Sequence, residues 1–185
     1  MSILICGIDE AGRGPLAGPV CAAAVILPEN FPSGKLDDSK KLSSSSRDAL
    51  KEIIFQSALA WGIGWASAAE IDAINIHNAT LLAMKRAFEN AALPNVKIRA
   101  IVDGRFAPDI SIPCEPMVKA DTLIPAVMAA SILAKTTRDR LMESYALFYP
   151  EYGYEKHKGY PTKKHREVIQ RCGPSPIQRM SFRVL

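Results

Sequence analysis

Residues 3–20 read I-L-I-C-G-I-D-E-A-G-R-G-P-L-A-G-P-V, and this stretch organises the chain. Residues 3–8 have the length and the β-branched content of a buried strand. The strand delivers two adjacent carboxylates, Asp9 and Glu10, into a glycine-rich turn. Successive strand side chains point to opposite faces, so both carboxylates reach one site only if the strand ends there and the backbone turns. The layout predicts a cation site.

The turn that follows the two acids is suited to binding phosphate. Gly12 and Gly14 allow backbone N–H groups to approach a ligand closely, and Arg13 carries a fork of donors. The neighbouring acids would repel a phosphate unless a metal ion lay between them. An Asp-Glu pair taken alone is more often a solvated turn, but here carboxylates, a metal and a phosphate-binding loop belong together.

The same turn also satisfies the loose dinucleotide-binding pattern G-x-G-x-x-G/A, which is a weak signal. That fold needs a helix to begin inside the loop. Pro15 and Pro19 crowd the loop, and residues 20–27 are more typical of a second strand. We therefore rank the dinucleotide interpretation low.

Composition favours one α/β domain in a reducing compartment. The chain has 185 residues, 48% of them hydrophobic, which is enough for one well-filled domain and short for two. Its four cysteines include no C-x-x-C pair, so neither a disulfide framework nor a zinc site is indicated. A basic leader and an apolar run of roughly 18 residues are both absent from the sequence. We expect a cytoplasmic protein with no membrane partner.

Positive charge gathers at the C-terminal end of the sequence. From residue 151 onward, eight Lys or Arg oppose three Glu, a net charge of +5, which leaves −1 for the rest of a chain whose net charge is +4. A basic region beside a near-neutral core is typical of a polyanion-binding face, although basic surfaces are also common on soluble proteins. Aromatic and histidine side chains interleave with the charges and favour nucleic acid. They are Tyr154, His157, Tyr160 and His165.

Seven short motifs follow one another along nearly the whole chain, each occurring once. They are G-I-D-E-A-G-R-G-P-L-A-G-P-V (7–20), D-D-S-K-K-L (37–42), V-D-G (102–104), K-A-D (119–121), A-A-S-I-L-A-K-T-T-R-D (129–139), H-K-G-Y-P-T (157–162) and G-P-S-P-I (173–177). In these motifs the sequence resembles the type 2 ribonuclease H family, specifically its bacterial ribonuclease HII branch.

The resemblance implies an α/β ribonuclease H-like fold, with a central mixed five-stranded sheet flanked by helices and a C-terminal helical extension. Residues 1–185 would form one catalytic domain, and residues from about 150 would form a basic substrate-binding extension. The periodicities predict the element order β-β-α-β-α-α-β-α-β-α. After the first two strands, strands are expected at 61–66, 98–102 and, at an edge, 111–118. Helices are expected from 43 to about 60, from a capping box of Ser67 and Glu70, over 78–91, and up to about Phe148. In the tail, Thr162 is expected to cap a short helix.

The resemblance also implies an activity. It predicts an endonuclease that cuts the RNA strand of RNA/DNA hybrids and cuts at single ribonucleotides in duplex DNA, leaving 3'-hydroxyl and 5'-phosphate ends. Such an enzyme serves ribonucleotide removal in DNA repair and RNA primer processing. Carboxylates without thiolate or imidazole select Mg²⁺ or Mn²⁺. Two ions roughly 4 Å apart would activate water and stabilise the leaving oxygen. We expect a monomer.

Two further acids complete the predicted metal site. Asp103 follows an apolar strand and precedes a glycine, and Asp9 likewise follows an apolar strand shortly before a glycine. The resemblance makes Asp103 the third ligand, which would bridge the two ions together with Asp9. Asp121 and Asp139 compete to be the fourth. They lie 18 residues apart, so an unbroken helix would separate them by roughly 27 Å and only one could reach the metal. Asp121 lies just past a strand, so we choose it and interpret Asp139 as part of a structural ion pair.

Substrate recognition is assigned by the resemblance. The backbone of Gly12, Arg13 and Gly14 would read the ribose 2'-hydroxyl and the adjacent phosphate, since this hydroxyl distinguishes RNA from DNA. Tyr160, on a loop constrained by a glycine and a proline, would pack on the sugar at the DNA side of the junction. The resemblance also places Lys40 or Lys41 near a phosphate.

Two other interpretations compete with this one. Ribonuclease HIII shares much of this pattern but carries an extra N-terminal substrate-binding domain, and this chain reaches its acid pair by residue 9. A catalytically silent hybrid-binding module is the alternative from another class. The presence of all four acids argues against it.

Overall fold

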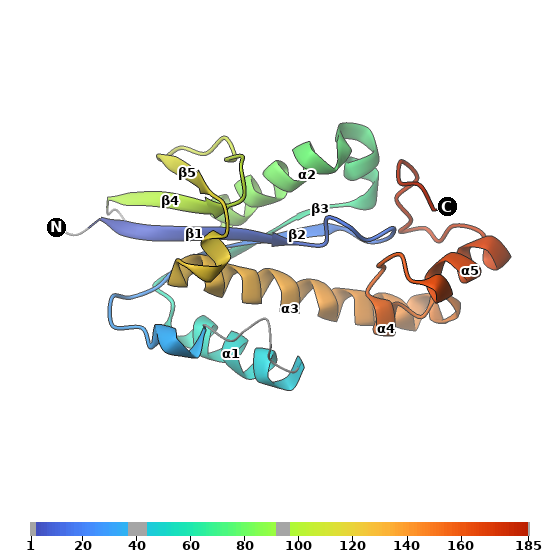
Figure 1. Ribbon diagram of the computed structural model, residues 1–185, viewed down its shortest axis with the longest axis horizontal. Helices are drawn as coiled ribbons and strands as arrows, with labels where there is room; N and C mark the ends of the chain where they lie inside the picture. The colour runs from blue at the N-terminus through green and yellow to red at the C-terminus, as the bar shows by residue number, and fades with distance from the viewer. Residues whose placement is uncertain (1–2, 37–43, 92–96, 185) are drawn as a thin grey trace.

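The computed structural model describes residues 3–36, 44–91 and 97–184, and in them a mixed sheet is covered by helices (Figure 1). The strands are β1 (Leu4–Ala11), β2 (Val20–Ile26), β3 (Ala60–Ala66), β4 (Ile98–Asp103) and β5 (Cys114–Met117). The helices are α1 (Ser44–Ser57), α2 (Ala68–Asn90), α3 (Pro125–Phe148), α4 (Tyr154–His157) and α5 (Lys163–Cys172), with 3-10 turns η1 (Ser33–Lys35), η3 (Ala120–Thr122) and η4 (Pro150–Tyr152). Among these helices, none is long and apolar enough to span a membrane.

The sheet has the strand order β3-β2-β1-β4-β5. β2 is antiparallel to both β1 and β3, whereas β4 runs parallel to β1 and β5 runs parallel to β4. The expected mixed five-stranded sheet is therefore confirmed, with the fifth strand at an edge. Because β1 and β4 are parallel, the acids that follow their apolar segments lie at the same end of the sheet, where both strands finish.

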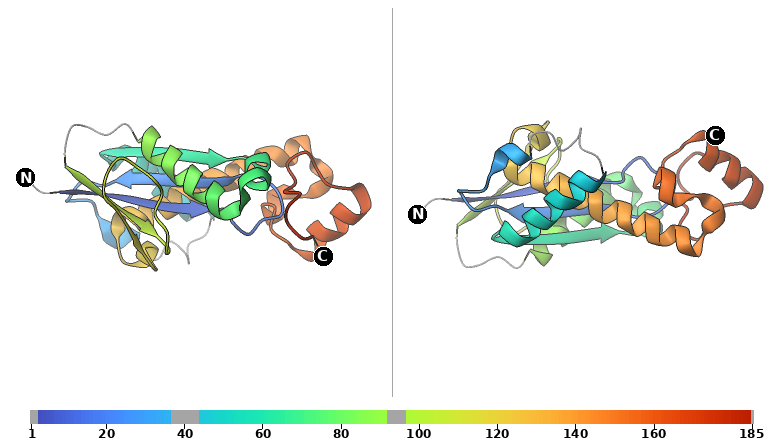
Figure 2. Two further views of the ribbon diagram at one scale, coloured as in Figure 1. Left: turned by 90° about the horizontal axis from the view of Figure 1, so that it is seen from above. Right: turned by 90° about the horizontal axis from the view of Figure 1, so that it is seen from below.

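The helices divide into two layers and an extension. α2 covers one face of the sheet, and α3 with α1 outside it covers the other (Figures 1 and 2). α4 and α5 lie beyond the end of the sheet, next to the loop that joins β1 to β2. Backbone hydrogen bonds join the two regions, since Leu16 N donates to Gly159 O and Gly18 N donates to Ile177 O, each at 2.8 Å.

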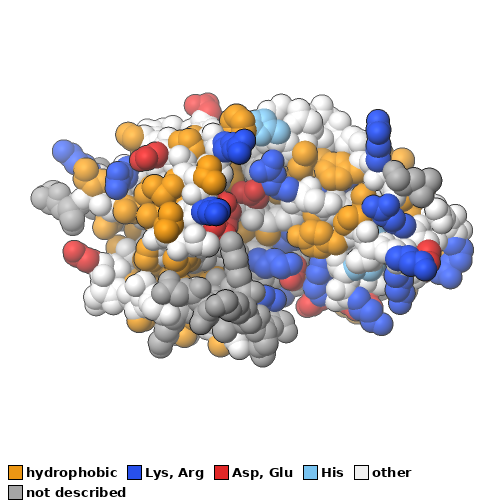
Figure 3. Space-filling model, viewed as in Figure 1, with side chains coloured by type: hydrophobic (Ala, Val, Ile, Leu, Met, Phe, Trp, Pro, Cys, Tyr) orange, Lys and Arg blue, Asp and Glu red, His pale blue; other side chains and the backbone are white. Residues whose placement is uncertain are grey.

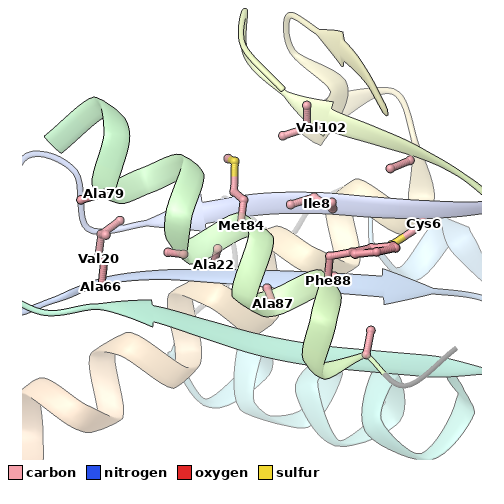
Figure 4. Packing of buried hydrophobic residues seen from close by; sticks show 14 of the residues in the cluster. Cys6, Ile8, Val20, Ala22, Ala66, Ala79, Met84, Ala87, Phe88 and Val102 are labelled. Carbon is pink, nitrogen blue, oxygen red and sulfur yellow. The ribbon is translucent and has the colours of Figure 1, made fainter. Parts of the chain in front are cut away.

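The larger apolar cluster lies between α2 and the sheet. Figure 4 shows Met84, Ala87 and Phe88 of α2 packed against Ile8 of β1 and Ala22 of β2, and all five side chains are buried. Burial of such side chains is the main favourable term in folding. This packing fixes the central strand that carries the acid pair.

Glycines set the distance between the helices and the sheet. A Cβ on Gly64 of β3 would lie 2.1 Å from the carbonyl oxygen of Ala83 in α2. A Cβ on Gly7 of β1 would lie 2.1 Å from the carbonyl carbon of Ala126 in α3. Real Cβ contacts do not reach such distances, so these helix backbones pack on strand positions that only glycine can occupy.

Several local predictions are confirmed. Ser67 and Glu70 form the capping box at the start of α2, with reciprocal backbone hydrogen bonds of 3.2 and 2.8 Å. α2 is broken at Asn75, whose φ of 65° is not helical, so two helices were correctly expected in this region. Thr162 caps α5 by accepting a hydrogen bond from His165 N.

Other predictions of the elements were wrong. The predicted order placed a helix between the fourth and fifth strands, but residues 104–113 contain neither helix nor strand. Pro108 and Pro113 lack backbone N–H groups and favour an extended connection there. β1 does not end before the acid pair: it continues to Ala11, because β2 pairs with it as far as Ala11 and Cys21.

The close approach at Gly64 predicts a large loss of stability on substitution. Gly64→Ala should lower the free energy of unfolding by about 1 to 3 kcal/mol, because its methyl group would force α2 away from β3. Gly34→Ala is the matched control, since a Cβ there meets no atom within 4 Å. Denaturant unfolding of both variants checks this, and similar losses in the two would contradict the packing argument.

Candidate active site

Two of the predicted carboxylates lie side by side because of the strand register. Ile8 of β1 is paired with Val102 of β4, so Asp9 and Asp103 each follow one residue later on neighbouring parallel strands. Pairing of β1 with β4 ends at this point, while β1 continues along β2 through Glu10. Both carboxylates of the acid pair therefore lie beyond the paired part of β4, near Asp103.

Asp9 is a buried acid whose pKa is strongly shifted. Its side chain is 5% exposed, and burial, followed by the charges of Glu10 and Asp103, raises its pKa well above the ordinary value of 3.8. Hydrogen bonds from the Ser131 side chain and from Glu10 N, the latter at 2.8 Å, act in the opposite direction. A buried carboxylate beside two others is typical of a functional site.

Glu10 connects the acids to residues 12–14, which we call the glycine loop. Burial raises the pKa of Glu10, the neighbouring Arg13 lowers it, and the charge of Asp103 raises it again. Arg13 Nη1 lies 3.3 Å from Glu10 Oε1, while about half of the Arg13 side chain stays exposed. An arginine held in this way is available to a phosphate in the adjacent groove.

Asp121 joins the group through the backbone. It lies in η3, between β5 and α3, and its N–H donates to Asp103 Oδ1 at 3.5 Å. α3 begins only at Pro125, so Asp121 is on a separate turn rather than on the long helix. Asp139 lies inside α3 and forms an ion pair with Lys135 at 2.8 Å. The interpretation of Asp139 as an ion-pair residue is thus confirmed.

The four carboxylates fit a hard divalent cation by their chemistry. They supply only oxygen ligands, which Mg²⁺ and Mn²⁺ prefer, and a cation would offset the repulsion that raises the pKa of Asp9. Within residues 3–36, 44–91 and 97–184, no group of three or more Asp, Glu, His or Cys side chains has the spacing that would hold a metal ion.

A groove of about 440 Å³ adjoins the acids, lined by Glu10, Gly12, Arg13, Gly14, Ser131, Lys135 and Tyr160 among others. Gly14 lies beside the Tyr160 ring, because a Cβ there would be 3.8 Å from a ring carbon. Figure 3 shows acidic side chains near the middle of one face, with Lys and Arg side chains on several sides. Basic surroundings of an acidic centre suit a phosphate chain that must approach carboxylates. Lys40 and Lys41 fall outside the described residues.

Sequence reasoning missed several side chains around this groove. Ser131 and Lys135 of α3 reach it. The buried Arg138 donates to Pro19 O, and the buried Arg179 donates to Gly12 O. Ser131, Lys135 and Arg138 lie within the motif at 129–139 and recur every three or four residues, as one helix face requires. That spacing was an available signal. The role of Arg179 had no local signal, since its partners lie more than 160 residues away.

Comparison with known sequences gives a consistent result. A family model described as Ribonuclease HII matches residues 6–185. The Ribonuclease HII of Treponema denticola is 55% identical over 193 residues, covering 97% of this chain and 98% of that protein. The Ribonuclease HII of Dechloromonas aromatica is 54% identical over 179 residues, covering 97% and 90%.

Solved structures share the fold. Ribonuclease H2 from Pyrococcus horikoshii OT3 matches with a TM-score of 0.77 at 25% identity, over 98% of this chain and 95% of that one. Bst-RNase HIII, solved in complex with Mn²⁺, matches with a TM-score of 0.80 at 17% identity, over 99% of this chain and 68% of that one. The predicted ribonuclease H-like fold is confirmed.

The crowding at Asp9 predicts opposite effects of one substitution on stability and on metal response. Asp9→Asn should raise the stability of metal-free protein by about 1 to 2 kcal/mol, or roughly 2–8 °C in Tm, because it removes a buried charge beside two acids. The same variant should lose the rise in Tm that Mn²⁺ gives the parent chain. Thermal melts with and without Mn²⁺ check both effects. A variant that is less stable without metal and still responds fully to Mn²⁺ would contradict this.

The placement of the two competing acids predicts a ranking. Asp121→Asn should lower kcat/KM on an RNA/DNA hybrid about a hundredfold or more, because Asp121 lies next to Asp103. Asp139→Asn breaks an ion pair that is partly exposed, so it should cost under about 1 kcal/mol of stability and little activity. Steady-state kinetics on variants of matched Tm check the ranking, and the reverse order would place the site at the wrong end of α3.

Proposed function

Because this chain belongs to the ribonuclease HII family, we propose that it also cuts at single ribonucleotides embedded in duplex DNA, in ribonucleotide removal and RNA primer processing. Family membership makes the chain a ribonuclease H, an endonuclease that hydrolyses the RNA strand of RNA/DNA hybrids with a divalent metal ion. The proposal for single ribonucleotides rests mainly on one observation. Glu10 of the acid group, the glycine loop and Tyr160 line one groove.

We propose that Asp9, Glu10, Asp103 and Asp121 hold the metal, either Mn²⁺ or Mg²⁺. When bound, the ions supply an activated water and neutralise charge on the phosphate and the leaving 3'-oxygen, which gives 3'-hydroxyl and 5'-phosphate ends. The chain's own residues prepare the acids for this. Ser131 and Glu10 N hydrogen-bond the Asp9 carboxylate and so orient it.

Selection of RNA is proposed for the loop of Gly12, Arg13 and Gly14. The 2'-hydroxyl both donates and accepts hydrogen bonds, so backbone groups of a fixed loop can recognise it. Gly12 has a φ of 95°, a conformation that a side chain rarely permits. Arg13 brings an exposed guanidinium to the adjacent phosphate.

Tyr160 is suited to the sugar on the DNA side of the junction. Tyr160 is exposed, and its ring lies beside Gly14, with Lys135 Nζ 5.5 Å from the ring centroid. Its backbone is fixed on both sides. The Tyr160 carbonyl lies 3.0 Å from His165 Nδ1, and Tyr160 N donates to His157 O at 2.8 Å. A rigid ring next to the loop can therefore test the nucleotide that follows the ribose.

The region from about residue 150 is proposed as the substrate-binding extension of a single catalytic domain. Lys163 and Lys164 are exposed on α5, and Arg166 is partly exposed on the same helix. Such charges bind the phosphate backbone without reading sequence. Since one chain supplies the four acids, the loop and Tyr160, we also propose that it works as a monomer on RNA/DNA hybrids and ribonucleotide-containing duplex DNA.

The test uses a DNA duplex with one embedded ribonucleotide, with and without Mn²⁺ or Mg²⁺. The parent chain should cut it only with metal. Tyr160→Phe should keep this activity, whereas Tyr160→Ala should lose about tenfold to a hundredfold in kcat/KM, because the ring face makes the contact. The loss should be greatest on the single ribonucleotide, where one RNA-to-DNA step is read.

A long RNA/DNA hybrid is the matched control substrate. Activity of the parent chain on the hybrid without cleavage at a single ribonucleotide would refute the proposed specificity. Equal losses of Tyr160→Ala on both substrates would make Tyr160 a general backbone contact instead of a junction reader.

A further inference from the structure

Two buried arginines hold the loop that joins β1 to β2 from its inner side. Arg179 donates from Nε to Gly18 O at 2.8 Å, from Nη1 to Arg13 O at 3.0 Å and from Nη2 to Gly12 O at 2.6 Å. Arg138 donates from Nε to Pro19 O at 2.9 Å and from Nη2 to Ala17 O at 3.1 Å. Together they bind five carbonyl groups between residues 12 and 19.

Burying two guanidinium groups to hold one loop is unfavourable in free energy. Arg179 is fully buried and Arg138 is 1% exposed. Burial and the charge of Arg138 lower the pKa of Arg179 to about 9, while Asp72 acts against this shift. Buried charges that face backbone carbonyls lose their hydration and gain only hydrogen bonds in return. Residues kept at such a cost point to a need for fixed geometry.

The geometry of the peptide bond shows what is fixed. In a trans peptide the C=O of one residue and the N–H of the next point in opposite directions. Because Arg179 binds the carbonyls of Gly12 and Arg13, the N–H groups of Arg13 and Gly14 point away from it. All three loop residues line the groove.

The arginine on α3 explains the glycine at the start of the loop. A Cβ on Gly12 would lie 2.1 Å from Nε of Arg138, so the guanidinium packs against the bare backbone. Gly12 is therefore required by its inner neighbour as well as by its φ of 95°.

The segment that carries Arg179 is itself anchored at two points. Arg179 N donates to Leu16 O at 2.8 Å, so the segment runs along the loop. Just beyond it, the Asp72 carboxylate on α2 accepts hydrogen bonds from Met180 N and Ser181 N, both at 2.9 Å. The segment that carries the guanidinium is thus hydrogen-bonded both to the loop and to α2.

We propose that Arg179, together with Arg138, is a positioning residue for ribonucleotide recognition: it binds the inner carbonyls of the glycine loop and thereby aims the N–H groups of Arg13 and Gly14 at the substrate. This inference rests on the proposed role of the loop in reading the 2'-hydroxyl. It adds a residue from the far end of the chain that touches no substrate.

Arg179→Lys is the central variant. Lysine keeps the positive charge but replaces a rigid fork by a single ammonium, which cannot hold three carbonyls in fixed directions. On a duplex with one ribonucleotide, kcat/KM should fall about tenfold to a hundredfold. The preference in Kd for this duplex over an all-DNA duplex, measured without metal, should shrink as well.

A double-mutant cycle with Gly12→Ala, which displaces the loop backbone because its Cβ would lie 2.1 Å from Arg138 Nε, separates positioning from a loss of stability. If Arg179 acts through the loop, the double variant should be at most about twofold worse than the more damaging single variant. Arg86→Lys is the matched control, since Arg86 also donates to a carbonyl, that of Trp65 at 2.7 Å, but on α2. It should lower Tm and leave the preference in Kd unchanged.

The outcomes are distinguishable. Multiplicative losses in the double variant, or an unchanged preference in Arg179→Lys, would overturn the positioning role. An unchanged preference in a folded Gly12→Ala would instead refute the proposed function of the loop. If Arg179→Lys does not fold, as judged by circular dichroism, Asp72→Asn weakens the anchor of the same segment and should reduce the preference in the same direction; no reduction in a folded Asp72→Asn would overturn the proposal.

Discussion

The parallel pairing of β1 with β4 is the constraint on which the site depends. It brings Asp9 and Asp103 next to each other at one edge of the sheet, where like charges oppose folding. The apolar layers on both faces supply the free energy that holds these strands in register. Apolar packing thus stabilises the fold, and the repulsion among the acids offsets part of that free energy, as expected where a cation is to bind.

One face of α3 connects the acids, the groove and the loop after β1. Ser131, Lys135 and Arg138 follow one another by four and three residues, so they share a helix face. The first hydrogen-bonds Asp9, the second borders the groove, and the third binds the loop after β1. The N-terminal end of the helix packs directly on Gly7. A small shift of this one helix would therefore disturb acids, groove and loop together.

Much of the fold and part of the site could be predicted from the sequence, because their signals are local. Strand periodicity, the capping box at Ser67 and the acids after apolar strands are readable within a few residues. The length of β1 was not, since pairing with β2 decides it. The helix expected between β4 and β5 was wrong because two prolines override the pattern. Arg179 escaped because its partners are distant in sequence, and no periodicity records such a contact.

The anchoring of the glycine loop by Arg179 also dictates an order of events during synthesis. The loop follows β1, yet two of its carbonyl groups are bound by a side chain 166 and 167 residues later. Closing so long a segment is entropically slow, and contacts of this range dominate the time a domain needs to fold. Sheet and acids can therefore assemble on the ribosome before the loop has its inner donors. The proposed reading of the ribose by this loop would therefore have to wait for the segment that carries Arg179.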